Sequence, residues 1–467
     1  MLRTTLVCGL IAVAAVATAS ADDFPLTFHT IAAKDVMAFP GGYGAMGQLR
    51  LAKPAKLAKE PKAVSPHPLY GECGETDGAA AMLFRLDESK GYGKGYDQLI
   101  VDVNQNGDLT DDVPASLVVL PTNPKTPSQG TQQRLFGPIG APAGKLIAGE
   151  RPIYFAQAYI RDLSSALGSS QNAENLYAGQ VRLKAGWYVD TTVELKGLKQ
   201  KVGVFDGDSN LRLGDVAKPQ TYQNPGQEEN WYFGQGDSLL TDTDGSGAFE
   251  SDQFDTESCP FGPLLYPGAT PYKLALTPDG KSLRVEPWTG ALAEVTLQPY
   301  GEQVCRVTLA WERPNSQWQL IRAGVAGGKI NVPPGNYRLY KCELLGKAAP
   351  RDQMMAAGYQ RVTRKPTALV AGKANTLRCG APLEIKVTAE KRTPQPWELN
   401  SGNQRNRPSA SDSEFVLSIN ADVRGVDGEI YSAYAKGDKF KAEPPQPTFT
   451  VMDGRGKKVA TGNLEFG

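Results

Sequence analysis

The chain has 467 residues, 50 basic and 50 acidic side chains, and a formal net charge of zero. This balance gives no long-range attraction for phosphate backbones, so we expect no nucleic-acid partner. The chain also contains 50 glycines and 34 prolines, and short segments rich in Val, Leu, Tyr and Thr lie between them. Many turns with few long helical periods predict a mainly β fold.

The first 21 residues are predicted to be an export signal. Arg3 precedes an apolar run from Leu6 to Ala17, and Ala19-Ser20-Ala21 has the small-x-small pattern of a cleavage site. No later stretch approaches the ~20 consecutive apolar residues that span a bilayer. We therefore expect an exported protein, periplasmic or extracellular, with no membrane span.

The remaining chain is too long for one hydrophobic core, and we predict a multidomain protein. Two related β modules bearing acidic loops are expected first, followed by two small β-sandwiches, the last one immunoglobulin-like. Their predicted ranges are 22–120, 150–292, 294–380 and 381–467. Within the first module, the lysine- and alanine-rich stretch from Lys53 to Lys62 is predicted to be a solvated linker.

In the third domain, alternation along the strands predicts which side chains point inward. Two sets alternate in this way: Cys305, Val307, Leu309 and Trp311, and then Tyr340, Cys342 and Leu344. Five cysteines remain after the export signal, and an oxidising compartment favours disulfides. We expect a bond between Cys342 and Cys379, with Cys305 as the rival partner of either.

The first acidic loop, Asp102 to Asp112, has oxygen-bearing side chains at positions one, three and five and a glycine at position six. The residues concerned are Asp102, Asn104, Asn106 and Gly107. This spacing lets a loop wrap Ca²⁺, which takes about 6–8 oxygen ligands. Asp108 would add its carbonyl, Asp111 or Asp112 would supply a bidentate carboxylate, and Leu109 would anchor the loop in the core. A metal-free turn is the alternative, but its carboxylates would repel one another.

Two further loops repeat the pattern. The predicted ligands are Asp206, Asp208, Asn210 and Asp215 in the second loop, and Asp242, Asp244, Ser246, Glu250 and Asp252 in the third. The second loop has Leu211 where the first and third have a glycine, so it matches the calcium pattern less well. The two loops either form separate sites or converge on one.

The stretch from Asp102 to Asp112 resembles the EF-hand-like and dockerin-type calcium loops of secreted bacterial proteins. The segments 202–206 and 462–466 also resemble parts of uncharacterised multidomain β proteins of bacterial envelopes. These resemblances imply Ca²⁺ and export, and they imply no particular activity. A dockerin has paired loops with flanking helices, whereas here a strand leads into the loop.

The sequence favours a non-enzymatic role. The two histidines, His29 and His67, have no zinc-ligand spacing, and neither a nucleophile elbow nor a phosphate loop is present. We expect an exported calcium-binding structural or adhesion-type protein of the bacterial envelope, with a cell-envelope protein or a polysaccharide as partner. The alternative is a carbohydrate-binding or glycoside-hydrolysing protein. A glycosidase would place two carboxylates in a groove lined by tryptophans.

Overall fold

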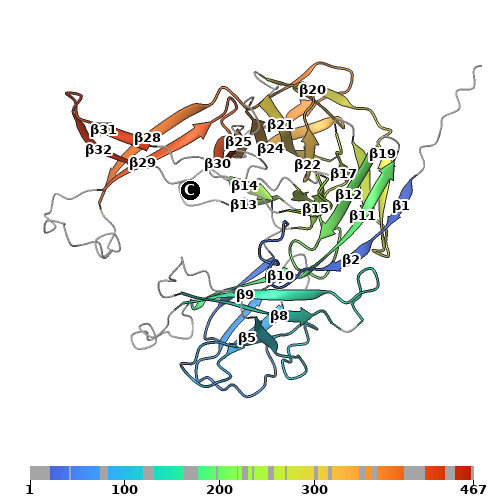
Figure 1. The fold of residues 1–467 in the computed structure, drawn as a ribbon, viewed down its shortest axis with the longest axis vertical. Coiled ribbons are helices and arrows are strands. Elements are labelled where there is room, and N and C mark those ends of the chain that lie inside the picture. The colour runs from blue at the N-terminus through green and yellow to red at the C-terminus, as the bar shows by residue number, and fades with distance from the viewer. Residues whose placement is uncertain are drawn as a thin grey trace, which may run out of the picture.

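The structure is a computed structural model, and it describes residues 21–41, 44–73, 82–118, 131–142, 144–161, 177–195, 198–217, 219–222, 230–233, 236–243, 245–250, 257–268, 271–298, 303–313, 318–346, 354–359, 365–393, 416–436 and 448–463. Except for Ala21, the predicted export signal lies outside this set. The described chain is built from β-strands arranged in several sheets, as the composition predicts (Figure 1). Among the described residues there is no helix long and apolar enough to cross a bilayer.

The first large sheet has eight strands and curves until its two end strands meet. In spatial order these are β3 (Ala45–Leu49), β10 (Gly179–Ala185), β9 (Ile153–Arg161), β8 (Thr131–Gly140), β7 (Ala115–Val118), β6 (Gln98–Val101), β5 (Met82–Asp87) and β4 (Leu69–Cys73). Beyond β3, Arg50 and Tyr70 exchange two backbone hydrogen bonds of 2.9 and 2.7 Å. Gly47 permits this approach, because a Cβ there would lie 2.2 Å from the Glu72 carbonyl oxygen.

Two smaller sheets pack on the first large sheet. One has the order β16 (Ser258–Pro260), β15 (Ser238–Thr241), β12 (Leu198–Phe205), β11 (Trp187–Leu195) and β2 (Thr27–Thr30). The other has the order β1 (Asp22–Pro25), β19 (Ser282–Pro287), β18 (Tyr272–Leu276) and β17 (Leu264–Leu265). Separately, β13 (Pro219–Tyr222) pairs with β14 (Asn230–Phe233). The three sheets share one hydrophobic core, in which Trp187 and Phe205 are fully buried.

A second hydrophobic core lies between two sheets of the C-terminal half. The smaller sheet has the order β23 (Lys329–Val332), β20 (Ala293–Gln298) and β27 (Asn375–Arg378). The larger has the order β22 (Trp318–Gly324), β21 (Val304–Glu312), β24 (Gly335–Leu345), β25 (Met354–Tyr359), β30 (Ile430–Lys436), β29 (Val416–Arg424) and β28 (Glu384–Arg392), and β26 (Thr367–Leu369) pairs with β24. Two separate cores make this a multidomain protein.

The inward faces of this sandwich follow the predicted alternation only in part. Val307, Leu309 and Trp311 are buried as predicted, whereas Cys305 is half-buried. On β24 the buried set is Tyr337 and Leu339, followed by Cys342 and Leu344. A register shift in the β21–β24 ladder between Thr308 and Leu309 changes the phase of the alternation. Tyr340 is half-buried and lies out of this inward set, because a bulge moves one residue to the opposite face.

The thiols of Cys342 and Cys379 lie together in the second core. Both residues are fully buried, and hydrogen bonding with Cys379, together with burial, raises the pKa of Cys342 well above its usual value. The thiol of Cys305 instead lies 3.4 Å from the carbonyl oxygen of Glu343. In an oxidising compartment, we expect Cys342 and Cys379 to be joined by a disulfide worth about 3–4 kcal/mol. Peptide mapping without reductant measures this, and recovery of both peptides as separate alkylated thiols would contradict it.

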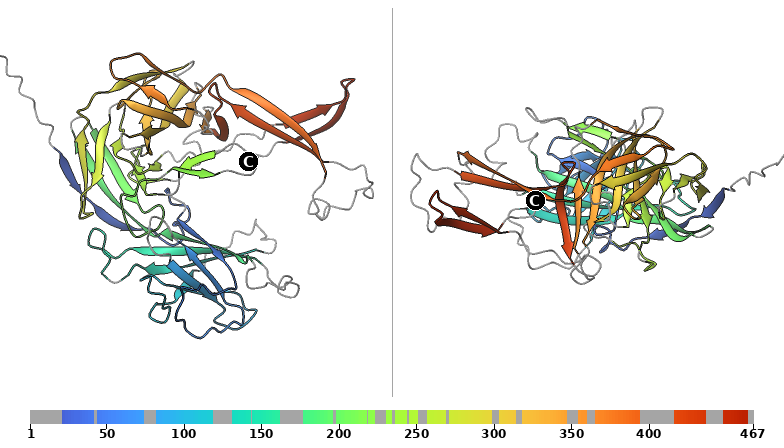
Figure 2. Two further views of the ribbon diagram at one scale, coloured as in Figure 1. Left: turned by 180° about the vertical axis from the view of Figure 1, so that it is seen from behind. Right: turned by 90° about the horizontal axis from the view of Figure 1, so that it is seen from above.

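The sheets cross the predicted domain boundaries. The first large sheet joins β3–β7 with β8–β10, and β1 pairs with β19, so the ranges 22–120 and 150–292 are interleaved. Past residue 381, β30 pairs with β25, so the described residues 384–436 continue the preceding sheet. Beyond it, β31 (Thr448–Met452) pairs with β32 (Lys458–Asn463). The β28–β29 and β31–β32 hairpins extend away from the body as an arm (Figure 2).

Candidate metal centre

Each of the three acidic loops begins where a buried strand ends. β6 leads into Asp102, β12 into Asp206 and β15 into Asp242. The three initial aspartates are all buried, with exposed fractions of 1%, 0% and 8%. A buried carboxylate requires hydrogen-bond donors or a cation. The backbone of each loop supplies the donors.

The described positions of the three loops share two backbone features, although the loop sequences differ. The residues at positions four and six have positive φ in every loop: 60° and 76° at Gln105 and Gly107, 57° and 68° at Ser209 and Leu211, and 73° and 80° at Gly245 and Gly247. In each loop the position-one carboxylate accepts hydrogen bonds from the backbone N–H groups of positions five and six. Their lengths are 3.0 and 2.8 Å at Asp102, 3.1 and 3.2 Å at Asp206, and 3.0 and 2.8 Å at Asp242.

Leu211 therefore does not set the second loop apart. A non-glycine residue in the left-handed region costs about 1–2 kcal/mol. Leu211 is 8% exposed and packs in the first core, and burial of a leucine side chain contributes a comparable amount, about 1.5–3 kcal/mol. The absence of glycine at position six is thus no argument against this loop.

A second carboxylate closes each loop by accepting the backbone N–H of position two; it is half-buried in the first loop and buried in the other two. In the first loop Asp112 accepts from Val103 at 3.4 Å. In the second, Asp237 accepts from Gly207 at 3.3 Å, and in the third, Glu257 accepts from Thr243 at 2.9 Å. Asp237 and Glu257 also accept hydrogen bonds from the far side of their loops. Asp237 accepts the backbone N–H of Asp215, and Glu257 accepts the backbone N–H of Glu250. The sequence reasoning missed these two closing carboxylates.

Sheet topology explains where the closing carboxylates come from. β12 and β15 are antiparallel, and Phe205 lies opposite Ser238, so the residue that follows β12 lies beside the residue that precedes β15. Similarly, β16 is antiparallel to β15, which places Glu257 beside the end of β15. Each of these two carboxylates comes directly before a strand that pairs with the strand leading into the loop. This position identifies the closing residue once the strand pairing is known.

In the second loop, three carboxylates converge. Oxygens of Asp206, Asp208 and Asp237 all lie within 4.8 Å of one another, and all three residues are buried. Asp208 is 7% exposed, and its Oδ1 has no hydrogen-bond partner among the described residues. Tyr154, on β9, donates to Asp206 at 2.7 Å. These three aspartates could together hold a metal ion.

Ionising this triad without a cation is costly. Burial, and next the charge of Asp208, raises the pKa of Asp206 to about 8. Burial, and next the charge of Asp215, raises the pKa of Asp208 to about 6. Burial and the charge of Asp206 raise the pKa of Asp237 well above its usual value. A bound cation would remove this repulsion and restore the charged form.

The other predicted ligands of the second loop lie beside the triad. The Asn210 amide nitrogen donates to Asp208 at 3.1 Å and to Asp215 at 2.6 Å. Because the amide hydrogens are the positive end of the group's dipole, they partly neutralise the two carboxylates. All four predicted residues of this loop therefore meet, and Asp237 joins them.

The first loop brings most of its predicted ligands together. The amide nitrogens of Asn104 and Asn106 both donate to Asp111, at 3.2 and 2.9 Å. Burial, and next the charge of Asp102, raises the pKa of Asp112 to about 6. Leu109 is fully buried and packs with Leu57, so the predicted anchor is confirmed.

The stretch from Lys53 to Lys62 packs against this loop, so the predicted solvated linker is wrong. Leu57 is buried, and the backbone N–H of Lys59 donates to the Gly107 carbonyl at 3.1 Å. The Lys59 ammonium pairs with Asp108 at 2.8 Å, and hydrogen bonding to Lys59 lowers the pKa of Asp108 to about 2. The Asp108 side chain is thereby engaged outside the loop, and its carbonyl is the predicted ligand.

The third loop is described only in part, because Asp244 and Asp252 lie outside the described residues. Ser246 and Glu250 surround the loop turn, where the Ser246 hydroxyl accepts the Ala248 N–H at 3.3 Å and Glu257 accepts the Glu250 N–H at 2.7 Å. The strand β15 separates Asp237 from Asp242. The second and third loops therefore lie at opposite ends of one strand and do not converge.

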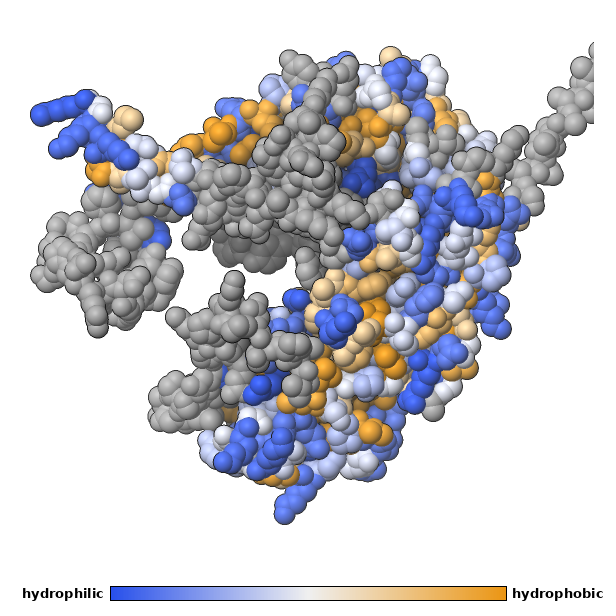
Figure 3. Space-filling view, in the orientation of Figure 1, coloured by the Kyte–Doolittle hydropathy of each residue, from blue (hydrophilic) through white to orange (hydrophobic). Residues whose placement is uncertain are grey.

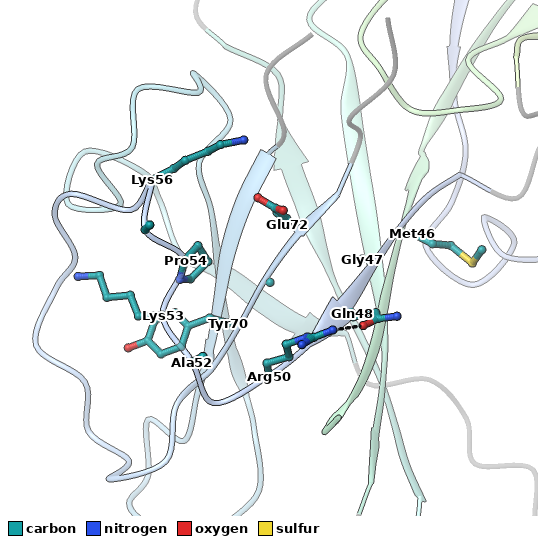
Figure 4. A pocket seen from close by; sticks show the side chains of 12 residues that line it. Met46, Gly47, Gln48, Arg50, Ala52, Lys53, Pro54, Lys56, Tyr70 and Glu72 are labelled. Carbon is teal, nitrogen blue, oxygen red and sulfur yellow. Dashed lines mark hydrogen bonds between the residues drawn. The ribbon is translucent and has the colours of Figure 1, made fainter. Parts of the chain in front are cut away.

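Two surface pockets lack the carboxylate pair that glycoside hydrolysis requires. One, of about 630 Å³, is lined by Arg50, Lys53, Lys56 and Tyr70, and Glu72 is the one acid in its lining (Figure 4). The other, of about 400 Å³, includes Trp288 and Trp311, and its one acid is Glu286. Trp311 is 8% exposed and stacks on Tyr337, so most of its surface packs in the core. Neither lining offers the pair of carboxylates that hydrolysis needs.

Comparison of the chain with protein-family models, with curated proteins and with solved structures gave no match. The candidate centre is therefore defined by its own geometry. The three loops have positive φ at positions four and six, and in the second loop three buried carboxylates converge so closely that a metal ion could be held between them.

Proposed function

We propose that the protein is an exported calcium-binding structural or adhesion-type protein of the bacterial envelope, in which Ca²⁺ stabilises loops at strand ends. The observation that carries the proposal is the buried group formed by Asp206, Asp208 and Asp237, in which one oxygen of Asp208 has no partner within the described part of the chain. Export, as proposed from the N-terminal sequence, would expose the loops to a compartment where calcium is abundant.

Calcium is the cation that best suits these donors. The described candidate ligands are carboxylates, amides, one hydroxyl and one backbone carbonyl, all with hard oxygen donors, and the cluster of Asp206, Asp208 and Asp237 includes no histidine or cysteine. Soft or imidazole-preferring metals such as zinc favour sulfur and nitrogen. Mg²⁺ demands near-ideal octahedral geometry and keeps several waters, whereas Ca²⁺ accepts the irregular oxygen sets that loops provide.

A structural role follows from where the carboxylates are held. Asp237 and Glu257 are both buried and bind backbone N–H groups on two sides of their loops. An ion bound in these loops would hold each loop against the strands of the first core that flank it. The alternative, carbohydrate binding at the pocket that contains Trp288, has the support of one half-buried aromatic side chain in the lining.

Isothermal titration of CaCl₂ into the chelator-treated protein tests the proposal. We expect saturable binding in the wild type and loss of the second-loop contribution in an Asp206→Asn, Asp208→Asn variant, because both substitutions remove charge from the triad. Asp453→Asn is the matched control. This exposed aspartate accepts backbone N–H groups of Arg455 and Lys457, both at 2.9 Å, in the turn of an ordinary hairpin. Identical isotherms for the wild type and the double variant would contradict the proposed site.

A further inference from the structure

Strand β28 is an exposed sheet edge. It pairs with β29 on one side, and in the described part of the sheet it is the terminal strand. Its residues from Glu384 to Lys391 are all exposed, and Arg392 is half-buried. In Figure 3 the arm that contains this strand stands clear of the body and carries both hydrophobic and hydrophilic surface. An edge of this kind presents backbone N–H and C=O groups to any strand that can align with it.

The sequence of β28 is complementary to itself when two copies run antiparallel. With Thr388 opposite Thr388, Lys386 faces Glu390 and Glu384 faces Arg392. Twofold symmetry repeats each pair, so every charged residue on this face meets the opposite charge. On the other face, Val387 lies opposite Ala389, and Ile385 lies opposite Lys391, whose aliphatic chain can pack on it. Opposite charges placed directly across an antiparallel ladder are stabilising, and like charges are destabilising.

Only this register has these properties. A shift of two residues in one direction places Glu384 opposite Glu390, and the same shift in the other direction places Lys386 opposite Arg392. A shift of one residue joins the charged face of one copy to the apolar face of the other. Scattered lysines would protect an edge by repelling any copy of itself, whereas the alternating signs of β28 select a single alignment.

The second face of the strand gives the pairing an apolar component. Ile385 and Val387 are 67% and 61% exposed, and their partners across the ladder are Val423 and Ala421 of β29. The face is therefore a continuous apolar stripe on the arm. A second copy, related by a twofold axis through Thr388, would cover the outer edge of this stripe, with Ala389 of the second copy beside Val387 and the Lys391 side chain beside Ile385.

We propose that the protein forms a twofold symmetric dimer in which β28 of one copy pairs antiparallel with β28 of a second copy, centred on Thr388. This dimer is independent of the calcium loops, which lie on the first core. The contact is a single strand pair, so the association is weak and depends on concentration and salt.

Charge reversal tests the register without depending on the fold, because Lys386 and Glu390 are both exposed. Sedimentation equilibrium of the full mature chain is expected to show a monomer–dimer equilibrium. Lys386→Glu and Glu390→Lys should each weaken it by about tenfold or more, since each creates two like-charged pairs. The double variant should restore dimerisation, and an equimolar mixture of the two single variants should form a heterodimer.

A Thr388→Cys variant provides an independent readout. Paired Cα atoms in an antiparallel ladder lie about 4.5–5.5 Å apart, which a disulfide can span. We expect a cross-linked dimer on a non-reducing gel, and none from the matched Thr450→Cys variant on the neighbouring hairpin. A wild type that remains monomeric at all concentrations would overturn the proposal. A dimer that is insensitive to both charge reversals would do the same, because it would place the contact elsewhere.

Discussion

Chelation of calcium is expected to lower the melting temperature of the first core by about 5–10 °C. Binding to the folded form alone contributes about 2.7 kcal/mol at a hundredfold excess of ligand over Kd, and each kcal/mol shifts Tm by about 2–4 °C in a domain of this size. The physical cause is the repulsion within each loop, which the folded state suffers once the cation is removed. Differential scanning calorimetry in CaCl₂ and in chelator measures the shift.

The second core provides an internal control for this experiment. The loops extend from strands of the first core, and the sandwich around Val307, Leu309 and Tyr337 includes none of the described loop residues. In chelator, the melting temperature of the second core should stay unchanged while that of the first core falls. Proteolysis in chelator should increase near residues 100–115 and 205–255. Equal shifts in both transitions, or none, would show that calcium does not act through the loops.

The loop pattern can be recognised in the sequence because it is local. Aspartate, asparagine and glycine stand at fixed offsets, and all three loops have positive φ at positions four and six. The closing residues Asp237 and Glu257 are different. They reach their loops through pairing of β15 with β12 and of β16 with β15, so no local pattern identifies them until the strand order is known.

The same distinction applies to the fold. Alternating and buried hydrophobic runs predict a β protein with several cores, but a run does not specify its partner strand. β1 and β2 pair with β19 and β11, far along the chain, and a domain range drawn along the sequence cannot represent this. The wrong prediction that Tyr340 points inward has a comparable origin. The register shift between Thr308 and Leu309 depends on how β21 pairs with β24 and not on the composition of β24.

Replacing Asp237 by alanine is expected to destabilise the calcium-loaded protein by about 3 kcal/mol or more. Asp237 is 1% exposed, and it accepts backbone N–H groups of Gly207, Gly214 and Asp215 at 3.3, 2.5 and 2.9 Å. Each donor left unsatisfied in a buried site costs about 1–3 kcal/mol. Urea denaturation in CaCl₂ measures the loss. Asp279→Ala is the matched control, because this exposed turn residue also accepts a backbone N–H, that of Lys281 at 3.2 Å, and surface changes of this kind stay within about 0.5–1 kcal/mol.

The same variant separates a purely structural role for Asp237 from a role in holding the ion. In chelator, removing Asp237 also relieves its repulsion with Asp206, so the substitution should cost less there than in calcium. The stability difference between calcium and chelator should consequently shrink in Asp237→Ala and stay at the wild-type value in Asp279→Ala. If Asp237→Ala lowers stability equally in both conditions, Asp237 supports the loop through its backbone hydrogen bonds alone. Calcium would then have to act through the first or the third loop.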